Sequence, residues 1–199
     1  MKKRIILLLA VLMVAAIGAQ AQSRLEPMKQ TQQKLWGERY FGTWLSEKAS
    51  QQMLIFPSFE FPSALYVYRG YGETVRLQVK WCAVNKEAGP DEPKLKLDSL
   101  EIKTDDKTAL AFSDLIEHAV ATCMYNDRMG FDGTRYFFGD RIRVATTWSP
   151  DRGSNCKRLT DVLEKAMTAV KNQNEEELKG LLPEVEALTK VFEKLYPKD

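Results

Sequence analysis

The feature that most constrains the fold is a strict alternation of apolar and polar side chains between Thr74 and Val84. In an extended chain the apolar side chains fall on one side: Val75, Leu77, Val79, Trp81 and Ala83. The opposite side carries Arg76, Gln78, Lys80 and Cys82. A period of two is typical of a strand in an antiparallel sheet with one face on a core. We therefore predict a sheet built around this segment.

Other segments resemble strands of the same sheet. Residues 65–69 are expected to pair with the alternating strand through the turn Gly70-Tyr71-Gly72. Residues 94–103 form a further strand with an irregularity near Ser99. Residues 136–138 and 141–148 are predicted to form a hairpin around Gly139-Asp140. Together these segments give a sheet of about five strands.

The period of the apolar residues changes to that of a helix after Ser113, which is a suitable N-cap. Residues 108–112 extend this helix or form a strand, and the sequence does not separate the two. The C-terminal part, residues 154–196, reads as an antiparallel helical hairpin with its turn at Asn172-Gln173-Asn174. Pro183 should kink or restart the second of these helices.

The predicted fold class is therefore α+β. An antiparallel sheet carries one crossing helix and the C-terminal helix pair on one face.

The N-terminus resembles a secretory signal peptide over residues 1–21. Lys2, Lys3 and Arg4 precede an apolar run, and Ala19-Gln20-Ala21 fits a cleavage site before Gln22. The run is shorter than the ~20 residues that a spanning helix needs. We therefore predict export to the periplasm or the cell exterior, no membrane span in the mature chain, and one domain over residues 22–199.

The charge balance argues against nucleic acid as a partner. The full chain has 29 Lys+Arg and 27 Asp+Glu. Removal of residues 1–21 takes away three basic and no acidic residues, which leaves 26 basic against 27 acidic residues, a net charge of −1. A chain without a net positive field lacks the electrostatic basis for binding a phosphate backbone.

Three cysteines remain after cleavage, in a compartment where disulfides persist. The predicted hairpin lies between Cys123 and Cys156 and returns the chain towards its starting point. That topology favours a Cys123–Cys156 bridge with Cys82 left over. The alternative is that all three are small, partly buried apolar residues.

Little in the sequence indicates catalysis. His118 is the single histidine, and an i,i+4 hydrogen bond with Asp114 is its simplest role. No zinc-ligand spacing, EF-hand loop, nucleophile elbow or glycine-rich phosphate loop is present, so no metal, cofactor or catalytic residue is predicted.

The predicted hairpin offers the one suggestive surface. With a two-residue loop, Phe138 pairs with Arg141 and Tyr136 pairs with Arg143 on one face. Aromatic rings next to guanidinium groups stack on sugar rings or hold anions. A three-residue loop instead places Tyr136 and Phe138 on the core side.

Residues 36–71 hold ten of the twenty aromatic residues, and we expect most of them to cap the sheet. Within this segment, Gly42-Thr43-Trp44 resembles the Gly-x-Trp motif of the lipocalins. That resemblance implies an alternative fold, a small β-barrel with C-terminal helices, an apolar interior pocket and Trp44 at its base.

These observations favour a non-enzymatic binding protein of the cell envelope or exterior, with a protein or a glycan as its ligand. A carboxylate-dependent hydrolase acting on polysaccharide or peptidoglycan is the second hypothesis, because acidic residues are plentiful. A lipocalin-like carrier of an apolar small molecule is the third.

Overall fold

The structure, a computed structural model, describes residues 24–27, 46, 48–70, 72–86, 95–124, 133–140 and 143–195. Several predictions lie outside these residues and stay predictions. They concern the signal peptide at 1–21, the motif Gly42-Thr43-Trp44 and the side chain of Arg141.

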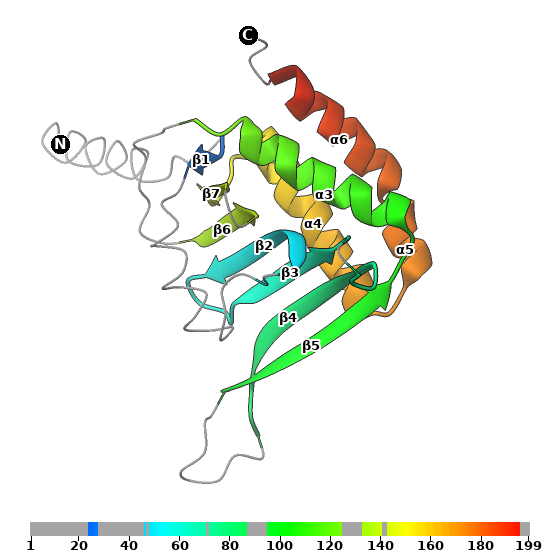
Figure 1. The fold of residues 1–199 in the computed structure, drawn as a ribbon. Coiled ribbons are helices and arrows are strands. Elements are labelled where there is room, and N and C mark those ends of the chain that lie inside the picture. The colour runs from blue at the N-terminus through cyan, green and yellow to red at the C-terminus, as the bar shows by residue number, and fades with distance from the viewer. Residues whose placement is uncertain are drawn as a thin grey trace, which may run out of the picture.

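One open antiparallel sheet of seven strands forms the base of the fold, in the order β1-β7-β6-β2-β3-β4-β5 (Figure 1). The strands are β1 (Glu26–Pro27), β2 (Ala49–Pro57), β3 (Ser63–Tyr68), β4 (Arg76–Val84), β5 (Leu95–Lys103), β6 (Thr134–Gly139) and β7 (Val144–Trp148). All pairings between neighbouring strands are antiparallel. The short strand β1 and the nine-residue strand β5 are the two edges.

The helices lie together on one face of the sheet (Figure 1). They are α3 (Asp106–Ala121), α4 (Asn155–Lys171), α5 (Glu175–Gly180) and α6 (Leu182–Leu195). The main core lies between the helices and the sheet, and its buried side chains include Leu65, Val79, Phe112, Tyr136, Phe138 and Leu163. The α+β class, the antiparallel sheet and the helices on one face are thus confirmed, and the open sheet does not fit the lipocalin-like alternative.

The helical layer corrects the predicted start of the crossing helix and shows the predicted restart near Pro183. Helix α3 begins before Ser113, because the carboxylate of Asp105 accepts a hydrogen bond from the backbone N–H of Thr108 at 2.7 Å and caps the helix. Residues 108–112 are therefore helical, and the N-cap predicted at Ser113 is corrected to Asp105. The chain restarts its last helix at Leu182, and Pro183 lies in the first turn, where its missing N–H costs no helical hydrogen bond.

Strands β1 and β2 go beyond the five that the pattern indicated. Strand β2 lies in the middle of the sheet between β6 and β3, and its side chains are buried from Gln51 to Phe56. A strand that is buried on both faces has no polar face, so it shows no alternation. Strand β5 also differs from expectation, because it pairs with β4 over nine consecutive residues without an irregularity at Ser99.

The face of the sheet away from the helices carries a second apolar cluster. Its buried members are Leu54, Phe56, Ala64, Tyr66, Tyr68, Phe137 and Val144. No described helix packs on this face (Figure 1). The middle of the sheet is therefore buried on both sides, whereas the outer residues of β5 are exposed.

Candidate functional site

The predicted surface on the hairpin is not formed as expected. Strands β6 and β7 pair through Tyr136↔Thr147 and Phe138↔Ala145, so neither aromatic residue stands opposite an arginine. Tyr136 and Phe138 are buried on the helix side of the sheet, with 7% and 1% of their surface exposed. Burying large rings in the main core removes more apolar surface from water than exposed packing against arginine does.

Arg143, one of the two arginines of the predicted surface, has a partner other than Tyr136. The guanidinium of Arg143 lies 3.6 Å from the Glu117 carboxylate of α3, and both side chains are about half exposed. The structure thus brings two of the predicted site residues together, Tyr136 and Phe138, but it places them in the core. Arg143 lies apart from them at the surface.

A groove beside Tyr136 is the strongest candidate for a functional site. It lies between the turn that joins β2 to β3 and the outer side of α4, and it has a volume of about 300 Å³. The residues that line it are Ile55, Pro57, Glu60, Phe61, Ser63, Thr134, Tyr136, Glu164, Met167, Thr168 and Lys171. We call it the turn–helix groove. It is at the lower end of the size range of small-ligand sites.

The wall of the groove is built around a hydrogen bond. The hydroxyl of Tyr136 donates to Oε1 of Glu164 at 2.7 Å, which ties β6 to α4. Burial raises the pKa of Tyr136 above its usual range, and the neighbouring Glu164 carboxylate raises it further. Tyr136 therefore stays protonated and keeps one carboxylate oxygen of Glu164 occupied, while the side chain of Thr168 bonds to the backbone of α4.

Glu60 and Phe61 of the turn at residues 58–62 line one side of the groove, and the same turn exposes a second aromatic ring, Phe59, outside that lining. Phe59 exposes 88% and Phe61 48% of its surface, and Glu60 lies between them. The turn is anchored to the start of β6, because Ser58 donates hydrogen bonds to the carbonyl of Gly133 from both its backbone N–H and its hydroxyl. At Gly133, which has φ of +137°, a Cβ would lie only 2.0 Å from Oγ of Ser149, so glycine is needed for this contact.

A second cavity, of about 390 Å³, lies where α3 and α6 end and α4 begins. Its described lining carries Leu25, Met124, Phe192 and Leu195, and no carboxylate. Cys156 also faces it, and burial, with a contribution from Asp151, raises the pKa of this thiol to about 12. None of the three cysteines forms a disulfide in the structure, so the expected Cys123–Cys156 bridge is not present there.

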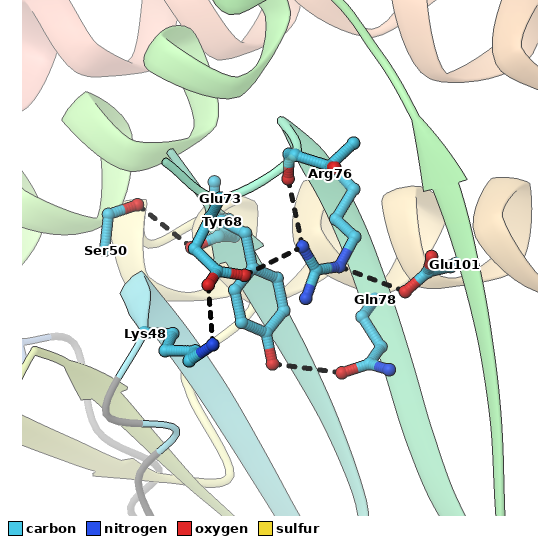
Figure 2. A network of polar contacts seen from close by, with 9 residues as sticks. Lys48, Ser50, Tyr68, Glu73, Arg76, Gln78 and Glu101 are labelled. Carbon is cyan, nitrogen blue, oxygen red and sulfur yellow. Dashed lines mark hydrogen bonds and ion pairs between the residues drawn. The ribbon is translucent and has the colours of Figure 1, made fainter. Parts of the chain in front are cut away.

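A network of polar side chains lies around the β3–β4 turn, and its contacts indicate a structural role (Figure 2). The guanidinium of Arg76 stacks on the Tyr68 ring at 3.9 Å, with Nε 3.0 Å from Glu101 and Nη1 3.4 Å from Glu73. Lys48 donates to Glu73 at 2.7 Å, and this hydrogen bond is the main cause that lowers the pKa of Glu73. The network joins the β3–β4 turn to β2 and β5, and its charges balance within it.

His118 has the local role that the sequence indicated, with a different acceptor. Its Nδ1 lies 2.8 Å from the backbone oxygen of Asp114, and Nε2 lies 3.7 Å from Glu193. Within the part of the chain that the structure describes, no group of three His, Cys, Asp or Glu residues is arranged to hold a metal ion. Over the same residues, no helix is long and apolar enough to cross a membrane.

Comparisons with protein-family models, with curated proteins and with solved structures found no match to this chain. The chemistry of the turn–helix groove is therefore the basis on which a function is assigned. The sequence singled out Tyr136 and favoured a surface position for it, with the core side of the sheet as the alternative, and the structure places it on the core side. One feature of the sequence points to Phe59, Glu60 and Phe61: they are three consecutive large side chains between Pro57 and Pro62.

Proposed function

We propose that the protein is a non-enzymatic glycan-binding protein of the cell envelope or exterior, and that the turn–helix groove is its binding site. The observation that carries the proposal is the exposed ring of Phe61 in a groove that also contains Glu60 and Glu164. Exposed phenylalanine rings are costly in water, whereas a binding site uses such rings as apolar platforms.

The chemistry of the lining favours a polyhydroxylated ligand. A sugar ring has an apolar C–H face, which fits an aromatic side chain, and hydroxyl groups around its edge. Carboxylate oxygens accept hydrogen bonds from hydroxyl groups, and such charge-assisted bonds are stronger than neutral ones. The groove supplies both kinds of contact, from Phe61 on one side and from Glu164, Thr168 and Lys171 on the other.

The test is a titration of the purified protein with soluble oligosaccharides and peptidoglycan fragments, followed by calorimetry. We expect Phe61→Ala and Glu164→Gln each to weaken binding at least about tenfold, a loss of about 1.4 kcal/mol. Glu164→Gln keeps an oxygen that accepts the Tyr136 hydrogen bond, so it removes charge and not the link between β6 and α4.

Glu184→Gln is the matched control. This carboxylate pairs with Lys165 at 2.9 Å and does not line the groove. Binding should be unchanged in this variant. If none of these glycans binds, or if the two groove variants bind as tightly as the native chain, the glycan proposal is wrong.

A carboxylate-dependent hydrolase is a second candidate, because Glu60 and Glu164 line the same groove. It predicts release of new reducing ends from the same glycans by the native protein. Glu60→Gln and Glu164→Gln would then each abolish that release. Binding without any release of reducing ends would leave the non-enzymatic function.

A further inference from the structure

The outer edge of β5 is an exposed surface that lies outside the groove. It is a nine-residue strand, and no strand of the described residues pairs with its outer side. Between Leu95 and Glu101 every side chain except that of Asp98 is exposed. In Figure 1, β4 and β5 form a ribbon that extends beyond the other strands.

This edge lacks two of the usual protections against strand pairing, a proline and a bulge. Natural edge strands are protected by proline, by a bulge or by charged side chains, especially lysine, and β5 carries Lys96 and Lys103. Strand β5 contains no proline, and its register with β4 is continuous from Lys103 to Leu95. The charge of Lys96 is offset by Asp98, whose Oδ1 lies 3.3 Å from the lysine Nζ.

One face of the ribbon also exposes apolar side chains. The register pairs Val84 with Leu95 and Cys82 with Leu97, so these four side chains share the face away from the helices. Leu95 and Leu97 are 43% and 44% exposed, and Val84 is 51% exposed. A neighbouring strand would cover part of this surface.

We propose that β5 pairs with β5 of a second copy of this chain, antiparallel, with Leu97 opposite Leu97. A twofold axis relates two identical antiparallel strands, so a symmetric register places one residue opposite itself. With Leu97 at the axis, Lys96 of each copy lies opposite Asp98 of the other. Leu95 then lies opposite Ser99, and the two apolar faces join.

The alternative symmetric registers are less complementary. An axis at Lys96 or at Asp98 places like charges opposite each other, which destabilises a strand pair. An axis at Ser99 places Lys96 opposite Ile102 and Asp98 opposite Leu100. Among the axes at residues 96 to 100, the one at Leu97 pairs opposite charges within the strand. An axis at Ile102 would also pair opposite charges, Glu101 with Lys103, but Glu101 already pairs with Arg76 at 3.0 Å. The charge pattern of this edge therefore favours the register centred on Leu97.

The test is the oligomeric state of the purified protein, measured by sedimentation velocity at low salt over concentrations up to about 1 mM. The high concentration is needed because this interface is small, and small interfaces are weak. We expect a monomer–dimer equilibrium. Lys96→Asp and Asp98→Lys each place like charges opposite each other twice, so each should raise the dimer dissociation constant at least about tenfold.

The double variant Lys96→Asp with Asp98→Lys restores both opposite-charge pairs, and it should return the dissociation constant to within about threefold of the native value. Lys190→Asp, on the exposed side of α6, makes the same charge change away from the edge and should have no effect. The proposal fails if the native protein is monomeric throughout. It also fails if the double variant dimerises no better than the single variants.

Discussion

The middle of the sheet and the β4–β5 ribbon belong to one sheet but differ in how deeply their side chains are buried. In β2 the side chains from Gln51 to Phe56 are all buried, because the strand has an apolar cluster on each face. In β5, Ile102 alone is buried. Most of the stability gained by burying apolar surface must therefore come from the middle, whereas β5 can change its surface at little cost to folding.

The sharpest test of this comparison is a pair of truncations. Phe138→Ala removes a ring with 1% exposure in the main core, so the free energy of unfolding should fall by about 3–5 kcal/mol. Leu97→Ala in β5 should change it by less than about 0.5 kcal/mol, because 44% of the leucine is exposed already.

Both values come from urea unfolding monitored by circular dichroism at a protein concentration where the chain is monomeric. Similar losses for the two variants would show that β5 contributes to stability as much as the middle of the sheet does. That result would contradict the difference between the two regions.

Alkaline pH gives a second and smaller effect. The pKa of Cys156 is about 12 in the folded protein and ~8.5 in an unfolded chain. Between these values the unfolded chain releases a proton that the folded chain keeps, so stability falls as the pH rises. From pH 7.5 to pH 9.5 the contribution of this thiol is a loss of about 1 kcal/mol.

The measurement compares urea unfolding at these two pH values, at which an unfolded tyrosine with a pKa of ~10 is still mostly protonated. Cys156→Ala should reduce the loss by about 1 kcal/mol. Burial also raises the pKa of Cys82 in the ribbon. Because Cys82 is less deeply buried, Cys82→Ala should reduce the loss by less. The reverse order would contradict the deeper burial of Cys156, which lies in α4.

The smallest effect concerns two neighbouring tyrosines on the sheet face away from the helices. The hydroxyl of Tyr66 is buried without a hydrogen-bond partner among the described residues, whereas that of Tyr68 donates to Gln78 at 3.0 Å. Tyr66→Phe should leave stability unchanged or raise it by up to about 1 kcal/mol, because it removes an unsatisfied polar group. Tyr68→Phe should lower it by about 1 kcal/mol.

Thermal unfolding of the two variants measures this difference. A clear loss of stability in Tyr66→Phe would show that the Tyr66 hydroxyl has a hydrogen-bond partner in solution. The sheet face away from the helices would then be more polar around Tyr66 than the structure shows.

The candidate site shows where sequence reasoning stops. Tyr136 was found from its place in a hairpin, but its contact with Glu164 joins residues 28 positions apart in the chain. No local pattern marks Glu164, because it is one polar residue among several on the flank of α4. The prolines around Phe59 and Phe61 did exclude a helix and a central strand, yet they did not show that a groove lies beside the turn.

By itself the sequence determined the elements whose side chains repeat with one period: β4 and its pairing with β3, the three apolar helical stripes, and hence the α+β class. These signals survive because each element has one buried and one solvated side. Only the tertiary structure decided the central place of β2, the inward direction of Tyr136 and the groove beside it. Burial on two faces erases the period, and a groove depends on residues that meet only after the chain has folded.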